Sequence, residues 1–393
     1  MRIIKFGISV WLICVLVCTI KAIAGPDGQI KLGVLIDRSG KTKDVGQQAW
    51  LGVEDYFKYL NENGGINGKK IKILMRDTGY YLLKAKKYYR DLKKEGVVGI
   101  IGWGTGTSKT LISDVNKDGI PWLPGSMAES LVDPIKPYNF ILGPSYKDQY
   151  LALIKYAHDN PKVEGRPVRV AFLYNSSEFG LAPIEPAEKM VEELGMDLVG
   201  KEIVELDAQE ADQQIQRLAR LSPDYLIIQE TGNATVAILN SCHKAGLKTA
   251  VLGTFYSGDA QVLMAAADAL EIVDLYFVSP ICRKCDRNEL IMQRINEFLI
   301  THRPGANFDA NIYYVQGWIM GTIFTEAIRR CGNDVTALRV RDALESLTDF
   351  DSGGVMGNIT FSPSDHKGSD KIKVYKANPE SLTFEEVTDW MKF

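Results

Sequence analysis

The sequence predicts an α/β protein of two lobes, each built on a doubly wound parallel sheet. Short β-rich runs alternate with amphipathic helical stretches, which is typical of βαβ units. The alternation restarts at residue 168, so two separate sheets are expected. The chain that follows the N-terminal leader has about 370 residues, more than one hydrophobic core usually accommodates.

The first series of elements covers residues 30–123. Its strands are short apolar runs, and its first helix places Ala49, Val53 and Leu60 on one face at helical spacing. A glycine-rich turn at 64–68 ends that helix. The predicted strands are 30–36, 71–75, 97–103 and 120–123, and the predicted helices are 46–63, 85–94 and one that runs from Ser108.

The second series is followed by long helical patterns and a C-terminal hairpin. Its predicted strands are 168–174, 200–204, 225–229, 249–255 and 273–279, and the helices between them are 187–194, 213–221 and 234–245. Further helices are predicted at 289–299, 313–330 and 335–347, and hairpin strands at 358–361 and 371–376. Because no flexible linker separates the two series, short strand-like crossings are expected to join the lobes.

The N-terminus has the pattern of a secretory signal peptide. Arg2 and Lys5 precede an apolar run at 8–20, and small residues then favour cleavage near Ala24. The run is shorter than the ~20 apolar residues that a membrane anchor needs. A lipoprotein signal acylated at Cys18 is the alternative, but the valine before it is a poor fit. We therefore expect a periplasmic protein from which residues 1–24 are removed.

The composition excludes several classes of function. The chain is 46% hydrophobic and 24% charged, as in ordinary soluble globular proteins. A net charge of −3 without a basic stripe argues against nucleic-acid binding. No second long apolar segment follows the leader. We expect a monomer that uses no cofactor and binds neither metal nor nucleic acid.

Four of the six cysteines remain after the leader is removed, and their pairing stays open. Cys282 and Cys285 have the spacing of a local disulfide, a redox motif or half a zinc site. A zinc site would need a second pair of ligands, and the four histidines are scattered. Reduced thiols, or a pairing that involves Cys242 and Cys331, are the alternatives in an oxidising compartment.

The most distinctive loop is Gly102-Trp-Gly-Thr-Gly-Thr-Ser108. It leaves a predicted strand and enters a predicted helix, the position at which ligands bind in open α/β sheets. The free N–H groups of a helix start attract a carboxylate or a phosphate. The loop is neither a dinucleotide fingerprint, because Thr107 replaces the third glycine, nor a phosphate-binding P-loop. A tight turn kept for packing is the alternative, but Trp103 at the end of a strand favours a site.

Catalytic motifs are absent from the sequence. There is no Gly-x-Ser-x-Gly elbow and no His-Glu-x-x-His. His366 lies in a turn-rich stretch and is interpreted as a hydrogen-bonded turn residue. The sequence therefore predicts a binding protein and not an enzyme.

Several segments together resemble a known family. They are NGGING at 63–68 and, in the family's order, GVVGIIGWGTGTS, IPWLPGS, LYNSSEFG, PDYLIIQ and GLKTAVLGTF. Over residues 29–380 the chain resembles the periplasmic branched-chain amino acid binding proteins of ABC transporters, which have the type I periplasmic binding protein fold. The resemblance implies two Rossmann-like lobes joined by three crossings, with the ligand between them, hinge closure, and docking of the closed form on a membrane permease.

The resemblance also implies lobe boundaries. The crossings would fall near 147–150, 276–281 and 347–353. The first lobe would then comprise 25–148 and 280–348, and the second lobe 149–279 and 349–393.

Carrying the family's site over to this chain reveals departures. The ligand carboxylate would meet Thr105, Gly106 and Thr107, and the next loop would be Gly125, Ser126 and Met127, where Met127 replaces a usual threonine unless Ala128 takes that place. Phe179 would replace a tyrosine that stacks on the ligand, and Thr231 a second tyrosine. The acidic residue that meets the ligand ammonium corresponds to Phe255, with Tyr256 beside it.

The missing acid bears on the ligand. An unpaired buried ammonium costs several kcal/mol. Either Glu230 or Asp259 supplies the charge, or the ligand has no ammonium. The aromatic residues Trp103, Phe179, Phe255 and Tyr256 favour a flat, aromatic or cationic partner.

The sequence thus predicts the solute-binding component of an ABC importer for a small carboxylate-bearing ligand, either amino acid-like or an aromatic or organic acid. A sensor that delivers the closed form to a membrane receptor is the alternative, and an exported enzyme on the same fold is a third.

Overall fold

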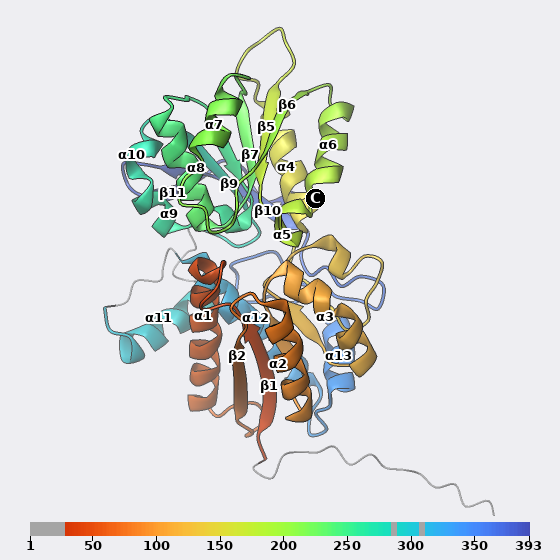
Figure 1. Ribbon diagram of the computed structural model, residues 1–393. Coiled ribbons are helices and arrows are strands. Elements are labelled where there is room, and N and C mark those ends of the chain that lie inside the picture. The colour runs from red at the N-terminus through yellow and green to blue at the C-terminus, as the bar shows by residue number, and fades with distance from the viewer. Residues whose placement is uncertain (1–27, 284–288, 306–310) are drawn as a thin grey trace, which may run out of the picture.

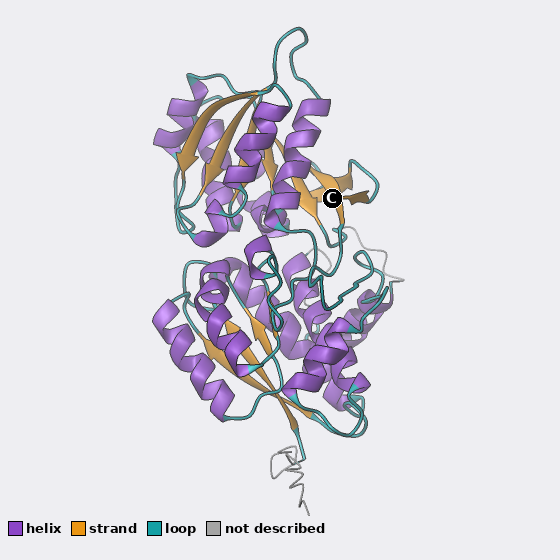
Figure 2. Ribbon diagram, turned by 90° about the vertical axis from the view of Figure 1, so that its right-hand side faces the viewer, coloured by secondary structure: helices purple, strands orange, loops and turns teal. Residues whose placement is uncertain are grey.

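The computed structural model describes residues 28–283, 289–305 and 311–393. It confirms the α/β class: there are two lobes, and each has a central sheet with helices on both faces (Figure 1, Figure 2). The expected signal peptide, 1–24, lies outside the described residues. No helix within the described ranges is long and apolar enough to cross a bilayer.

The first lobe is built on a four-stranded parallel sheet in the order β2-β1-β3-β4. Its strands are β1 (Ile30–Ile36), β2 (Ile71–Asp77), β3 (Ile100–Gly102) and β4 (Trp122–Pro124). Its helices are α1 (Lys43–Glu62), α2 (Leu82–Lys94), α3 (Thr105–Asp118), the 3₁₀ turn η1 (Glu129–Leu131) and, after the return from the second lobe, α11 (Leu290–His302), α12 (Ile312–Arg330) and α13 (Ala337–Glu345).

Different helices cover the two faces of this sheet because the β1 side chains alternate. Leu32 and Val34 belong to the core shared with α1 and α12, whereas Leu35 belongs to the core under α2 and α3. The helices α1 and α12 lie so close that a Cβ on Gly317 would be 2.3 Å from the Ala49 carbonyl oxygen. This close packing fixes the first turn of α1 at the edge that faces the second lobe.

The second lobe has an eight-stranded sheet in the order β11-β10-β9-β8-β7-β5-β6, with β12 paired to β10. Its parallel strands are β5 (Arg169–Tyr174), β6 (Asp197–Ile203), β7 (Tyr225–Gln229), β8 (Ala250–Gly253) and β9 (Asp274–Ser279). The antiparallel additions are β10 (Lys371–Asn378), β11 (Thr383–Glu386) and β12 (Met391–Lys392). Its helices are α4 (Tyr146–Asp159), α5 (Glu178–Leu181), α6 (Ile184–Glu193), α7 (Asp212–Ala219), α8 (Gly232–Lys244), the 3₁₀ turn η2 (Phe255–Ser257), α9 (Ala260–Ala265) and α10 (Ala267–Leu270).

Three chain segments cross between the lobes side by side. A Cβ on Gly143, in the first crossing, would lie 3.4 Å from Pro280 Cβ of the second and 3.8 Å from the Ser369 carbonyl oxygen of the third. The Ser369 N–H also donates to the Leu142 carbonyl oxygen over 3.1 Å. The lobes are therefore connected at one narrow place.

The position expected for the third crossing, 347–353, is wrong, and so is the assignment of all of 349–393 to the second lobe. Ile359 and Phe361 are buried in the core of the first lobe, and Ile359 pairs with Phe350 in an isolated β-bridge. These apolar side chains complete the first lobe before the chain leaves it.

Two further expectations differ in detail. Residues 147–150, expected as the first crossing, belong to α4, because Ser145 and Asp148 form a capping box that begins the helix there. No strand forms at 358–361, and β10 pairs with β9 and β11 instead. The chain leaves the second sheet after Ser279, the last residue of β9.

Candidate functional site

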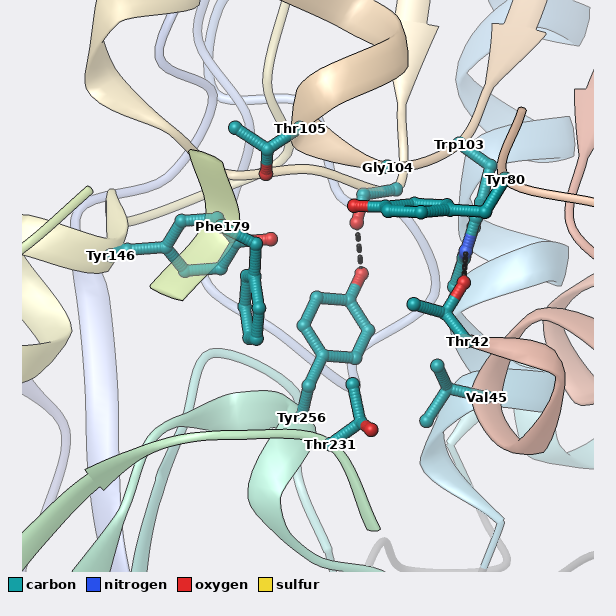
Figure 3. A pocket seen from close by; sticks show the side chains of 11 residues that line it. Thr42, Val45, Tyr80, Trp103, Gly104, Thr105, Tyr146, Phe179, Thr231 and Tyr256 are labelled. Atoms are coloured by element: carbon teal, nitrogen blue, oxygen red, sulfur yellow. Dashed lines mark hydrogen bonds between the residues drawn. The ribbon is translucent and has the colours of Figure 1, made fainter. Parts of the chain in front are cut away.

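A pocket lies between the two lobes, with a cavity volume of about 20 Å³ inside about 280 Å³ of space that is partly open to solvent (Figure 3). Its lining is mainly aromatic and hydroxyl-bearing, and it comes from loops at the carboxyl ends of the strands, where open α/β sheets bind ligands. The first lobe contributes Thr42, Val45, Tyr80, Trp103, Gly104, Thr105 and Gly125, and the second contributes Tyr146, Phe179, Thr231 and Tyr256.

One end of the pocket is formed by the N-terminus of α3. Thr105 is the first residue of that helix, and its hydroxyl group lies 2.7 Å from the hydroxyl group of Ser126. The Tyr146 side chain faces both groups; burial raises the pKa of Tyr146 to about 12, while these hydroxyl groups act in the opposite direction. This end therefore gathers neutral hydrogen-bond donors at the positive end of a helix dipole.

Tyr80 covers the same helix start. Its backbone has a left-handed φ of 62°, and a Cβ on Gly104 would be 2.3 Å from its ring, so only glycine fits there. Burial raises the pKa of Tyr80, an effect opposed by the backbone N–H groups of Gly106 and Thr105 that its hydroxyl oxygen faces.

Trp103 forms a side of the pocket and is held by the first lobe. Its indole N–H donates to Thr42 Oγ1 over 3.0 Å (Figure 3). The Thr42 hydroxyl in turn donates to Asp37 Oδ2 over 2.8 Å. A Cβ on Gly125 would lie 2.4 Å from the indole ring. The ring is therefore fixed before any ligand arrives.

Tyr256 reaches across the cleft from the second lobe. Its hydroxyl donates to the Gly125 carbonyl oxygen and accepts from Gln316 Nε2 over 2.8 Å, and both partners belong to the first lobe. Its ring meets Trp103 edge to face at 5.8 Å and Phe179 at 6.1 Å. Tyr256 thus stands in the middle of the pocket and joins the lobes (Figure 3).

The structure brings only some of the expected site residues to the pocket. Trp103, Thr105, Gly125, Phe179, Thr231 and Tyr256 line it, whereas Gly106, Thr107, Ser126, Met127, Glu230 and Phe255 do not. Gly106 remains close through its N–H group, and Ser126 through Thr105. Thr107 has a buried hydroxyl without a hydrogen-bond partner, and Met127 is buried beside Gln149.

Phe255 lies behind Tyr256 and not at the pocket. Its side chain is fully buried against Tyr313, with ring centroids 5.7 Å apart, and its N–H donates to Gln149 Oε1 over 3.0 Å. The position expected to face a ligand ammonium is therefore part of the core.

Neither of the two acids expected to replace the missing charge lines the pocket. Glu230 is fully buried beneath the cleft, where Oε2 accepts from Asn175 Nδ2 over 3.1 Å and Oε1 has no partner. Burial raises the pKa of Glu230 well above its ordinary value, which favours the protonated form of this carboxyl. Asp259 caps α9, with Oδ1 accepting the N–H groups of Gln261 and Val262.

Sequence reasoning missed five lining residues: Thr42, Val45, Tyr80, Gly104 and Tyr146. One of them carried a usable signal, because Ser145 and Asp148 have the spacing of a capping box and place Tyr146 at the start of a helix that faces the cleft. Tyr80, whose backbone φ is left-handed, has no recognisable signal in the sequence.

The described residues include three of the four cysteines on which the disulfide prediction rests. Cys285 lies outside the described residues, so the Cys282–Cys285 pair stays a prediction. Cys242 and Cys331 are buried free thiols; burial raises the pKa of Cys242 to about 12 and that of Cys331 to about 11. His366 is buried, its Nδ1–H donates to the Asn139 carbonyl oxygen over 2.8 Å and its ring stacks on Phe140, so it is a structural residue.

Comparison with known proteins identifies relatives by sequence. The curated Leu/Ile/Val-binding protein homolog 7 of Brucella abortus is 22% identical over 66% of this chain and 66% of its own length. The Leu/Ile/Val-binding protein of Escherichia coli is 24% identical over 57% of this chain and 60% of its own. The chain thus aligns with just under two thirds of the length of these relatives. They are named for binding and not for catalysis, as the sequence analysis expects of this chain.

Solved structures extend the likeness to the whole fold. A branched-chain amino acid ABC transporter protein of Thermus thermophilus with bound valine superposes with a TM-score of 0.86, at 25% identity, over 93% of this chain and 97% of that one. A substrate-binding protein of an ABC transporter from Aeropyrum pernix gives a TM-score of 0.82 at 26% identity, over 93% and 96%. A family model described as periplasmic binding protein matches residues 29–381. These matches confirm the resemblance seen in the sequence, and the chain belongs to the periplasmic binding protein family.

Proposed function

We propose that the protein is the periplasmic solute-binding component of an ABC importer, and that it captures a small carboxylate-bearing ligand in the pocket between its lobes. The observation that carries the proposal is the start of α3. There the helix N–H groups and the Thr105, Ser126 and Tyr146 hydroxyl groups converge on one end of the pocket. Neutral donors at a helix N-terminus stabilise a carboxylate without a full positive charge.

Closure of the lobes on the ligand is the second part of the proposal. The narrow set of three crossings provides a hinge, and contacts across the cleft favour the closed arrangement. Besides the Tyr256 hydrogen bond, the rim has two ion pairs, Lys41 with Asp207 at 3.3 Å and Lys109 with Glu178 at 2.5 Å. A closed pocket excludes water, so a few polar groups suffice to hold a charged solute.

The names of the relatives support an amino acid-like ligand, since several are Leu/Ile/Val-binding proteins and one structure holds valine. The aromatic lining also suits an aromatic or organic acid. A membrane permease is the partner that an importer requires.

Binding is tested by a thermal-shift panel of aliphatic amino acids, aromatic acids, small dicarboxylates and amides, followed by calorimetry. A ligand at 100 times its dissociation constant adds about 2.7 kcal/mol to stability, a shift that is easily measured. Thr105→Val should weaken a carboxylate ligand about tenfold, because it removes one donor and one of the hydrogen-bond partners of Ser126. Thr301→Val, on the exposed surface of α11, is the matched control. A panel without any shift, or full affinity in Thr105→Val, would contradict the proposal.

A further inference from the structure

Asp44, in the first turn of α1, carries a carboxylate that the proposed function leaves unused. We propose that Asp44 is the counter-charge for a protonated nitrogen on the ligand, so that the first lobe supplies the acid that the Phe255 position lacks. This inference rests on the proposed function, because it concerns the same pocket and the same ligand.

The carboxylate of Asp44 spans the cleft with only one of its oxygens satisfied. Oδ2 accepts the N–H of Asn233 over 3.1 Å, at the N-terminus of α8 in the second lobe. Oδ1 is buried and has no hydrogen-bond partner. A buried acceptor of this kind is costly unless a donor meets it.

Asp44 does not itself line the pocket, but its carboxylate lies directly behind residues that do. Asp44 directly precedes Val45, and the Thr231 side chain lies beside its carboxylate; both neighbours line the pocket. The Thr231 hydroxyl is itself buried, and it faces the Asp44 carboxylate and lowers the pKa of that group. Figure 3 shows Val45 and Thr231 at the end of the pocket opposite Thr105, with Tyr256 between the two ends. One ligand can therefore place a carboxylate at α3 and a donor at Asp44.

The electrostatics at this end favour a cation. Burial raises the pKa of Asp44, the N–H groups of Asn233 and Val45 oppose that change, and nearby Asp259 adds to it. Within the described part of the chain no lysine, arginine or histidine forms an ion pair with Asp44. A protonated nitrogen would offset the desolvation of the carboxylate, and the faces of Trp103 and Tyr256 would add cation–π attraction.

A purely structural role for Asp44, as a cap on α8, makes a different prediction. A cap acts through lobe closure, so its loss weakens every ligand alike. A counter-charge acts only on ligands that bear the nitrogen. Asp44→Asn separates the two roles, because asparagine keeps an oxygen for the Asn233 N–H and loses the charge.

The test uses calorimetry on two matched pairs of probes, L-leucine with 4-methylpentanoate and 5-aminopentanoate with pentanoate. In the wild-type protein the amine-bearing member of at least one pair should bind at least tenfold more tightly. Asp44→Asn should weaken that member by roughly 30-fold or more, and its amine-free partner by less than about threefold. Asp207→Asn removes another interlobe carboxylate, on the rim and away from the pocket, and should change both members equally.

Three results would overturn the inference. Equal weakening of both members in Asp44→Asn would show that Asp44 acts only as a cap on α8. Equal affinity of both members for the wild-type protein would show that the site does not recognise a protonated nitrogen. Both of these results leave the proposed carboxylate function standing. Absence of binding by all four probes would overturn the inference, and the proposed function would fail with it only if the whole thermal-shift panel also gave no shift. Melting curves of the unliganded variants confirm that each is folded.

Discussion

Two helix N-termini face the pocket, and the two lobes occupy them with opposite chemistry. The start of α3 is covered by neutral hydroxyl groups from Tyr80 and Thr105. The start of α8 has no side-chain cap of its own and receives the carboxylate of Asp44 from the opposite lobe. The first end can therefore accept an anion, whereas the second already holds one. The two ends of the pocket therefore differ in charge, and the proposed ligand would bind with its carboxylate toward α3.

The largest effect should come from filling the α3 end. Gly104→Val adds a Cβ that would lie 2.3 Å from the Tyr80 ring, on a residue whose φ is 79°. Tyr80 must move away from the helix start, so calorimetry should show a loss of affinity of roughly 100-fold, and denaturation should show a loss of about 2 kcal/mol. Gly96→Val is the matched control, since its φ of 75° is similar but its surroundings are open. Loss of binding in Gly96→Val as well would mean that strain alone is responsible.

Removal of the hydrogen bonds by which Tyr256 joins the two lobes should have the next largest effect. Tyr256→Phe loses the hydrogen bond to the Gly125 carbonyl oxygen and leaves Gln316 Nε2 without its acceptor. Both groups are buried, so we expect about tenfold weaker binding of every ligand, measured by calorimetry. Because closure is common to all ligands, amine-bearing and amine-free probes should weaken together. A selective effect on one class would show that Tyr256 recognises the ligand directly.

The second carboxyl near α8 should act on stability and not on binding. The pKa of Glu230 is raised by burial, so the folded protein holds this proton more tightly than the unfolded chain. Below pH 4.5 both states are protonated; as pH rises, only the unfolded chain ionises, and stability falls. Glu230→Gln should therefore raise the free energy of unfolding by about 1–2 kcal/mol at pH 8 and have little effect at pH 4.

Denaturation at several pH values checks this expectation. A variant that gains equally at both pH values would show that Glu230 is not neutral in the folded protein. Ligand affinity should stay unchanged, because Glu230 does not line the pocket.

The smallest effects should come from the rim. Lys109 and Glu178 join α3 to the second lobe through exposed side chains, and Lys41 pairs with Asp207 near α1. Exposed ion pairs contribute about 0–1 kcal/mol and are screened by salt. Lys109→Met and Lys41→Met should each change affinity by less than about threefold, and the change should vanish at high ionic strength. A large effect of either would mean that the rim, and not the pocket, governs closure.

The sequence predicts the α3 end of the pocket better than the α8 end. The loop from Gly102 to Ser108 carries local signals, namely glycines, a strand before it and a helix after it, and Thr105 does line the pocket. Asp44 carries no such signal, because it precedes an ordinary helix and meets α8 only after both lobes have folded. Phe255 and Tyr256 are neighbours in the turn η2, and the sequence does not indicate that only Tyr256 lines the pocket.

The elements of the fold follow from local periodicity, but the lobe boundaries do not. Strands such as β1 and β7 have the predicted limits, because they are short apolar runs that are buried on both faces. The position of the third crossing depends on where Ile359 and Phe361 are buried. The sequence of an apolar segment does not indicate which of the two hydrophobic cores the segment joins. That choice is made by tertiary packing.

The three crossings also dictate the order in which the chain can fold as it is synthesised. The strands from β5 to β9 are contiguous in sequence, so most of the second sheet can assemble early. The first sheet must wait, because the face that packs on α12 stays uncovered until the chain has passed Arg330. While this hydrophobic face of the sheet is uncovered, the first lobe of the nascent chain cannot reach its native state. Late completion suits the periplasmic protein that we propose, because such a chain must cross a membrane.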